Sequence, residues 1–306
     1  MASIGVDFLG SKLKSPTVLA SGILGVTTAS MRLCVENGAG AVTMKSITRE
    51  PRKGHAQPIV HQFPGGLLNA VGYSNPGYEA ALEEFSGIGR LGVPVIGSIV
   101  AKDADEFAFL AEHFADKLPF AALEIPLSCP HTPGFGTMAG QSTPEATLKI
   151  TKAVKKKTKL PLIVKLSPNV QNIAGLAKAA ETAGADAICA VNSMGPGMLI
   201  DISTGKRALG FGMGGVTGAA LMPIALRTVY DISQAVKIPI IGTGGVATGE
   251  DAMQMLMAGA TVVGVGTAVL DRGVEVFDRI NEELAELMDI YGYNRIKDII
   301  GVVDRG

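Results

Sequence analysis

Eight short apolar runs, separated by stretches with helical periodicity, constrain the fold of this 306-residue chain more than any other feature of its sequence. Their length and their content of Val, Ile and Ala are typical of strands buried on both faces. The runs lie at residues 17–20, 41–44, 93–99, 121–125, 161–166, 187–191, 239–241 and 261–265. Strands that alternate with helices form a parallel sheet, and eight such units close into a barrel. We therefore predict a (β/α)8 TIM barrel, with residues 1–306 as one domain.

The stretches between the runs predict the helices and the binding loops. Apolar residues recur there at intervals of three and four, which predicts helices over residues 103–117, 143–157, 173–183, 218–236 and 249–258. Two connections, residues 46–92 and 193–218, are too long for simple turns. Both follow strands at the C-terminal face of the expected barrel, where long loops commonly bind ligands. We expect them to be inserted loops at the mouth of a site.

Two glycine-rich turns near the end of the sequence predict a phosphate site. Gly242-Thr243-Gly244-Gly245 follows the seventh apolar run, and Gly264-Val265-Gly266-Thr267 lies within and after the eighth. Backbone N–H groups gather in such turns at the start of the following helix, where they bind anions. In barrel enzymes the loops after the last two strands commonly hold a ligand phosphate.

Polar residues at the ends of the other strands are expected to converge on the same mouth. They are Ser21, Lys45, Ser46, Ser128, Cys129, Lys165, Asn192 and Ser193. Two lysines beside a phosphate site indicate a ring that becomes anionic, and flavin mononucleotide (FMN) meets both demands. Lys165 is the candidate cation beside the flavin ring. Cys129 is the candidate base, because a thiol becomes basic where positive charge favours the thiolate.

Charge and composition argue against other classes of protein. The chain has 27 basic and 28 acidic side chains, so it has no overall field for nucleic acid or a lipid surface. Its three cysteines and four histidines lack metal-ligand spacing, and no metal site is expected. The longest uncharged stretch is too short to span a membrane, and no secretory signal is recognised at the start. We expect a soluble cytoplasmic enzyme with a small-molecule substrate.

A series of motifs resembles the dihydroorotate dehydrogenase family, class 1, and most closely the class 1B catalytic subunit. The motifs are Leu19-Ala20-Ser21-Gly22, residues 43–48, residues 69–77, Ser128-Cys129-Pro130, residues 164–169, Val191-Asn192-Ser193 and residues 214–218. The resemblance implies FMN contacts from Ser21, Lys45, Ser46, Ser98, Lys165, Val191, Gly218, Gly244, Gly245, Gly266 and Thr267. It implies substrate contacts from Lys45, Asn69, Ala70, Val71, Gly72, Tyr73, His131, Asn192 and Ser193.

The resemblance also implies a reaction and partners. In that chemistry (S)-dihydroorotate is oxidised to orotate in pyrimidine biosynthesis. Cys129 removes the C5 proton while the C6 hydride passes to flavin N5, and Lys45 and Lys165 complete the catalytic set. Class 1B implies a partner subunit that carries FAD and an iron-sulfur cluster and passes electrons to NAD, whereas class 1A relatives use fumarate. A homodimer is expected by analogy.

Three positions depart from the family's pattern and leave the substrate open. Pro126 stands where the family has an asparagine that touches both substrate and flavin, and proline has no side-chain donor or N–H. His131 and Ser98 stand at two further asparagine positions. The Ser-Cys-Pro-His loop, which continues to Gly140-Gln141, is similar to that of dihydropyrimidine dehydrogenase. A paralogue acting on another dihydropyrimidine or cyclic amide is therefore an alternative.

Two other classes of function also remain open at this point. A flavin-free barrel lyase could hold a phosphorylated substrate in the same glycine turns and use Lys45 or Lys165 for Schiff-base chemistry. A non-catalytic paralogue would bind the cofactor and turn over no reduced pyrimidine. The colour of the purified protein separates the first of these from a flavoprotein.

Overall fold

Eight parallel strands close into a barrel in the computed structural model, which describes residues 2–129, 132–135 and 140–303. In chain order the barrel strands are β3 (Thr17–Leu19), β4 (Ala41–Thr43), β7 (Val95–Ser98), β8 (Ala122–Pro126), β9 (Leu162–Leu166), β10 (Ala187–Ala190), β15 (Ile240–Thr243) and β16 (Val262–Val265). Each strand pairs with the next along the chain, and β16 pairs with β3. Each predicted apolar run forms one barrel strand, so the predicted (β/α)8 fold is confirmed.

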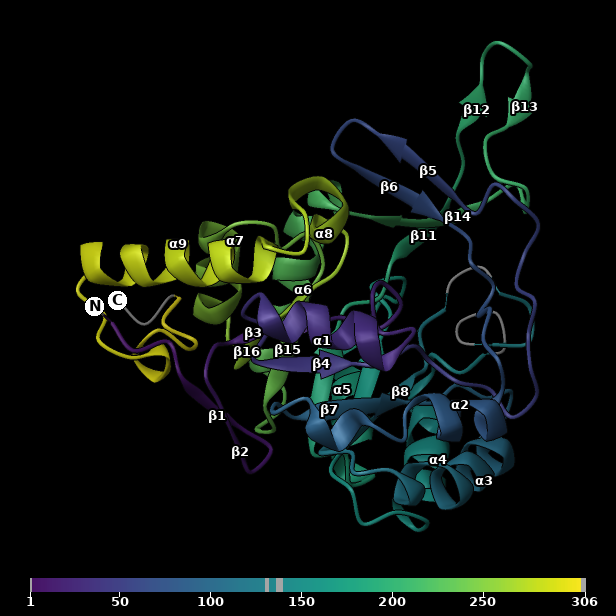
Figure 1. The fold of residues 1–306 in the computed structure, drawn as a ribbon, viewed down its shortest axis with the longest axis horizontal. Helices are drawn as coiled ribbons and strands as arrows, with labels where there is room; N and C mark the ends of the chain where they lie inside the picture. Colours follow the sequence, from purple (N-terminus) through teal and green to yellow (C-terminus); the bar gives the residue numbers. More distant parts are fainter. Residues whose placement is uncertain (1, 130–131, 136–139, 304–306) are drawn as a thin grey trace.

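Helices cover the outside of the barrel (Figure 1). They are α1 (Thr28–Glu36), α2 (Tyr78–Glu84), α3 (Ala104–His113), α4 (Pro144–Lys155), α5 (Ile173–Thr182), α6 (Met222–Ser233), α7 (Gly249–Met257), α8 (Ala268–Arg272) and α9 (Val276–Ile290). Thr143 caps α4 by accepting a hydrogen bond from the Ala146 N–H. The helix predicted over 218–236 is shorter, because a 3-10 turn at Ala219–Leu221 precedes α6. In the described part of the chain no helix is long and apolar enough to cross a membrane.

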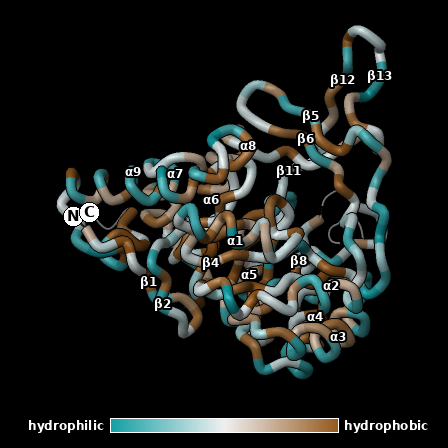
Figure 2. The backbone as a smooth tube through the Cα atoms, viewed as in Figure 1, coloured by the Kyte–Doolittle hydropathy of each residue, from teal (hydrophilic) through white to brown (hydrophobic). Residues whose placement is uncertain are grey.

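The barrel interior changes from apolar to polar along the strands. Where the strands begin, inward side chains such as Ile163 and Ile241 pack with Phe8 and Leu13. The last two come from the hairpin of β1 (Val6–Phe8) and β2 (Ser11–Leu13), which closes this end. Figure 2 shows hydrophobic segments concentrated in the barrel and mixed with hydrophilic ones in the outer helices. Towards the C-terminal ends of the strands, the inward positions carry polar groups, so the polar site lies above a packed apolar layer.

The two long connections form one structure at the C-terminal face. β5 (Val60–Phe63) and β6 (Gly66–Asn69) come from the first connection, and β11 (Met194–Gly197) and β14 (Gly214–Thr217) come from the second. They make a four-stranded antiparallel sheet in the order β11-β14-β6-β5. β12 (Ile200–Asp201) and β13 (Lys206–Arg207) pair as a separate hairpin that projects beyond this sheet (Figure 1). The β6–β14 pairing joins the two predicted binding loops to each other.

Candidate active site

A cavity of about 570 Å³ opens where the barrel strands end, and residues of the four-stranded sheet line its far side. This volume is ordinary for a small-molecule site. Many of the predicted site residues line it: Ser21, Lys45, Ser46, Asn69, Val71, Gly72, Tyr73, Cys129, Lys165, Asn192, Ser193 and Thr267. The convergence predicted from the strand ends is therefore present in the structure.

A smaller cavity of about 130 Å³ adjoins the first at the two glycine-rich turns. Its lining includes the remaining residues predicted to hold phosphate and flavin: Val191, Gly218, Gly244, Gly245 and Gly266. Gly245 has φ +86°, and a Cβ there would lie 2.6 Å from Met222 Cβ, so only glycine fits. Lys165 and Thr267 line both cavities, which therefore lie side by side.

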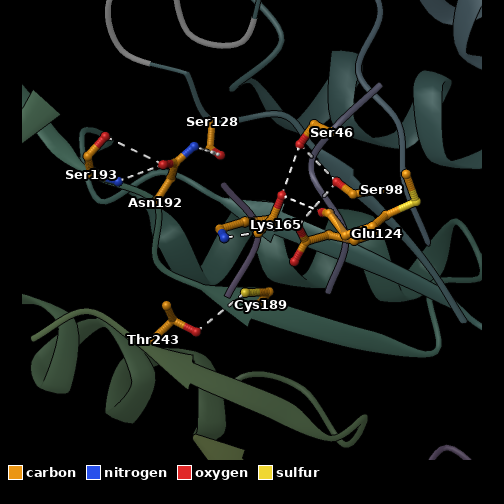
Figure 3. Close-up of polar contacts among 11 residues, drawn as sticks. Ser46, Ser98, Glu124, Ser128, Lys165, Cys189, Asn192, Ser193 and Thr243 are labelled. Atoms are coloured by element: carbon orange, nitrogen blue, oxygen red, sulfur yellow. Dashed lines mark hydrogen bonds and ion pairs between the residues drawn. The ribbon is translucent and has the colours of Figure 1, made fainter. Parts of the chain in front are cut away.

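Lys165, the cation that lines both cavities, forms a buried ion pair. Lys165 Nζ lies 4.0 Å from Glu124 Oε1, and both side chains are almost completely buried (Figure 3). Burial opposes the charge on Lys165, but the Glu124 carboxylate and then Cys189 raise its pKa above the ordinary lysine value. The ammonium group therefore stays charged, as the stabilisation of an anionic ring requires.

A chain of hydroxyl groups connects this ion pair to the first strand of the barrel. Ser98 Oγ donates to Glu124 Oε1 at 3.5 Å and lies 2.9 Å from Ser46 Oγ (Figure 3). Ser46 Oγ in turn lies 3.2 Å from Ser21 Oγ. Ser98 is fully buried behind Ser46 and lines neither cavity, so the structure does not bring it to the expected flavin contact. It positions Glu124 and Ser46 instead.

The candidate base lies beside the second lysine. The Cys129 thiol is buried and donates to Thr132 Oγ1 at 3.1 Å. Lys45 Nζ lies 5.8 Å from the centroid of the Tyr73 ring. Burial lowers the pKa of Lys45 to about 8; Cys129 partly offsets this shift and Lys165 adds to it. Lys45 is therefore a cation that titrates close to neutral pH.

Two asparagine side chains are held in place at the cavity wall. Asn192 Nδ2 donates to Ser128 Oγ at 2.9 Å, and Asn192 Oδ1 accepts from the Ser193 N–H at 2.8 Å (Figure 3). Asn69 Nδ2 donates to the Gly215 carbonyl oxygen at 3.1 Å, which links β6 to β14. Each amide keeps one N–H for a ligand.

Some predicted residues are not brought to the cavities. The Ala70 side chain packs with Leu68 and Leu209, so only its backbone can serve a ligand. His131 lies outside the described residues. Cys34 and Cys189 are buried packing residues, as expected, and burial raises their pKa values to about 11 and about 12. Among residues 2–129, 132–135 and 140–303, no group of His, Cys, Asp or Glu could hold a metal ion.

Two contributors were not predicted from the sequence. Glu124 could have been found from the sequence. It lies two residues after the inward Ala122 of β8, so strand alternation points its side chain into the barrel, where a buried Lys165 requires a carboxylate partner. No sequence pattern indicates the role of Thr132, because its contact with the Cys129 thiol depends on the conformation of the loop after β8.

The ion pair gives a stability prediction. Replacing Lys165 with methionine leaves the Glu124 carboxylate buried without a cation, and we expect the free energy of unfolding to fall by about 3–5 kcal/mol. Urea denaturation measures the change. The double variant Lys165→Met with Glu124→Gln removes both charges and should recover most of the loss. Equal instability of the single and double variants would contradict this account.

The fold and the adjoining cavities place the chain among the (β/α)8-barrel enzymes that hold a phosphorylated ligand at the C-terminal face. The chain belongs to the dihydroorotate dehydrogenase family, whose family model matches residues 3–288. "Dihydroorotate dehydrogenase B (NAD(+)), catalytic subunit" of Pyrococcus abyssi is 44% identical over 297 residues, which cover 97% of this chain and 98% of that protein. The protein of the same name from Methanosarcina acetivorans is 44% identical over 298 residues, 97% of this chain and 94% of the relative.

A solved structure shares the fold. The dihydroorotate dehydrogenase of Eimeria tenella, in complex with ferulenol, superposes with a TM-score of 0.85 at 22% sequence identity. The match covers 99% of this chain and 89% of that chain. Together with the relatives named above, the comparisons confirm the resemblance to the class 1B catalytic subunit.

Enzymes of this family bind FMN, and the residues present here fit that cofactor. At four of the glycines that line the smaller cavity, Gly218, Gly244, Gly245 and Gly264, a side chain would collide with the protein, whereas Gly266 leaves room; such bare backbone can form an amide cradle for phosphate. Asp271 also lines it, and Gln62 Nε2 donates to that carboxylate at 3.0 Å. The charged Lys165 stands where the two cavities meet.

Proposed function

We propose that this chain is an FMN-dependent dehydrogenase that oxidises (S)-dihydroorotate to orotate in pyrimidine biosynthesis. The observation that carries the proposal is the meeting of Cys129, Lys45 and Lys165 in one cavity of a chain that belongs to this family. The names of the relatives supply the substrate. A base, a cation for an anionic substrate and a cation for an electron-rich ring are the groups that this oxidation needs.

Different residues would bind the cofactor and take the substrate proton. Gly244, Gly245 and Gly266 would hold the FMN phosphate, and Lys165 would lie beside the ring. When bound, FMN supplies the two-electron acceptor of the reaction. Cys129 takes the C5 proton of the substrate, and Thr132, 3.1 Å from Sγ, orients the sulfur.

Other groups bind the substrate and cover it. Lys45 binds the substrate carboxylate, and Asn192 and Asn69 each offer their free amide N–H to the ring. The four-stranded sheet covers the cavity from the side opposite the barrel and limits the access of water.

The partner proposal follows from the names of the relatives, which are catalytic subunits with NAD(+) as acceptor. We infer a partner subunit that carries FAD and an iron-sulfur cluster, and a homodimer of this chain. The three free, buried cysteines suit a reducing cytoplasm, where we place the protein. Co-purification with a subunit that confers NAD reduction checks the partner.

One observation favours a second candidate function. Pro126 lines the larger cavity and offers neither a side-chain donor nor an N–H. A substrate that needs fewer donors at this point, such as dihydrouracil or another cyclic amide, would fit the same machinery.

Anaerobic reduction of the purified protein tests these proposals. The protein should be yellow, and dihydroorotate should bleach the flavin band at about 450 nm. Bleaching by dihydrouracil but not by dihydroorotate would favour the second candidate. A flavin that neither compound reduces would remove both, and a colourless protein trapped by borohydride with substrate would indicate a lyase.

The low pKa of Lys45 predicts a pH dependence of binding. The folded-state pKa of about 8 lies below the ordinary lysine value, so a rise in pH through 8 removes the positive charge. We expect the dissociation constant of orotate to be flat below pH 7 and to rise by up to about tenfold between pH 8 and pH 9. Perturbation of the flavin spectrum measures it.

The matched control for this prediction is Lys45→Arg, which keeps its charge over the whole range. Any pH dependence that this variant retains belongs to other groups. A wild-type dissociation constant that stays constant from pH 7 to pH 9 would contradict the assignment of Lys45 to the anionic part of the ligand.

A further inference from the structure

The Tyr73 hydroxyl is a buried polar group that makes no hydrogen bond of ordinary geometry to the described residues, although the Cys129 thiol lies close enough to interact with it. Its side chain lines the larger cavity, together with Lys45 and Cys129. Buried hydroxyls in proteins are almost always hydrogen-bonded. An unpartnered hydroxyl in the wall of a substrate-sized cavity therefore indicates a group that forms its hydrogen bond to a bound ligand.

The backbone holds this tyrosine in an unusual conformation. Tyr73 has φ +56°, in the left-handed region that bulky residues rarely adopt, and it follows Gly72 at φ +70°. Asn75 Nδ2 donates to the Tyr73 carbonyl oxygen at 2.7 Å, and Arg52 Nε donates to the Gly72 carbonyl oxygen at 3.3 Å. The Tyr73 ring packs against Phe135, with centroids 5.5 Å apart. Such backbone strain is typical of ligand clamps, and these contacts fix the position of the hydroxyl.

Each of the two neighbouring amide donors has one N–H in use and one left for a ligand. Asn69 Nδ2 donates to a backbone carbonyl oxygen at 3.1 Å, and Asn192 Nδ2 donates to a serine hydroxyl at 2.9 Å. Pro126 has no donor. Burial, and then the Cys129 thiol, raise the pKa of Tyr73 well above 10, so the hydroxyl keeps its proton and remains a donor.

We propose that the Tyr73 hydroxyl is a specificity-determining donor to a carbonyl or carboxylate oxygen of the substrate held against Cys129. It supplies a hydrogen bond that Pro126 cannot supply. The class of ligand, a pyrimidine with oxygen substituents, rests on the proposed function. Substrate and product both carry such oxygens, so the hydroxyl acts on binding rather than on the chemical step.

The test is Tyr73→Phe, which removes the hydroxyl and keeps the ring against Phe135. With the FMN-loaded protein, we expect the dissociation constant of orotate and the KM for dihydroorotate to rise about tenfold or more, while kcat changes less than about threefold. Uracil, which lacks the carboxylate, locates the acceptor: its binding weakens equally if a ring carbonyl is bound and stays unchanged if the carboxylate is bound.

Thermal unfolding gives a readout that is independent of turnover. Without ligand, the variant should unfold at the same temperature as the wild type or higher, because it no longer buries an unpartnered hydroxyl. Added orotate should stabilise the variant less than the wild type. The matched control is Tyr78→Phe: the Tyr78 hydroxyl donates to Glu79 at 3.2 Å, exposed to solvent, and its loss should leave orotate binding unchanged.

The outcomes separate the two proposals. If the wild type binds orotate and Tyr73→Phe binds it equally well, the role of Tyr73 is overturned and the proposed function stands. If the wild type holds FMN but gives no spectral change with orotate or uracil, the proposed function is overturned, and the role of Tyr73 is overturned with it.

Discussion

Replacing Cys129 with alanine is expected to slow the reduction of the flavin by dihydroorotate about 10²–10⁴-fold, the range for loss of a positioned base. The FMN content should remain that of the wild type, because the thiol lines the larger cavity and the glycine-rich turns lie in the smaller one. Anaerobic stopped-flow absorbance measures the rate, and a perchloric-acid extract measures the FMN. The expected effect is on the chemical step, so orotate binding should change little.

The control for Cys129→Ala is Cys34→Ala. Cys34 is equally buried but lies on α1, away from both cavities, and burial raises its pKa to about 11. This variant should reduce its flavin at the wild-type rate, although its stability falls slightly because a buried group is lost. A Cys129→Ala enzyme that keeps the full rate would exclude the thiol as base. Loss of FMN from it would show that the thiol has a structural role instead.

Gly266→Asp is expected to weaken FMN binding about a thousandfold. A Cβ at Gly266 would meet Ala20 and Ile23 at 3.6 and 3.7 Å, which are ordinary contacts, so the protein itself tolerates a side chain there. The new carboxylate would lie in the smaller cavity beside the phosphate. Two like charges about 4 Å apart repel by about 4 kcal/mol in such an environment. Titration of the apoprotein with FMN, followed by fluorescence quenching, measures the affinity.

Two further variants separate charge from bulk for this prediction. Gly266→Asn has nearly the same shape without the charge and should lose much less affinity. Gly87→Asp adds the same charge at a glycine where the nearest atom to a Cβ is Thr28 Cγ2 at 3.8 Å, outside both cavities, and should bind FMN normally. Wild-type affinity in Gly266→Asp would show that the phosphate binds elsewhere.

The barrel could be predicted from the sequence because its strands are buried on both faces. Ile163 faces the barrel interior and Val164 faces the helices, so a strand such as β9 is an uninterrupted apolar run. The four-stranded sheet could not be predicted. Thr217 and Leu67 lie 150 positions apart in the sequence, and the glycines and prolines around them conceal the alternation of a half-buried strand.

The candidate site was predictable to the extent that it depends on strand ends. Lys45, Cys129 and Asn192 each lie two or three residues after the end of a barrel strand, and parallel strands bring their carboxyl ends together. The contacts that orient these groups depend on side-chain packing and loop conformation. Ser98 thus bonds Ser46 and Glu124 inside the barrel rather than facing a cavity, and Thr132 reaches the Cys129 thiol across a loop. No pattern of residue types records such geometry.

The pairing of β6 with β14 has a consequence for how the sequence can vary. Leu67, Leu68 and Asn69 pair with Thr217, Val216 and Gly215. A shift of one residue in either strand would turn Asn69 away from the cavity, because neighbouring side chains point to opposite faces. An insertion or deletion within β6 or β14 therefore requires a compensating change in the paired strand. A change of ligand preference at this wall would involve matched substitutions in two segments that lie far apart in the sequence.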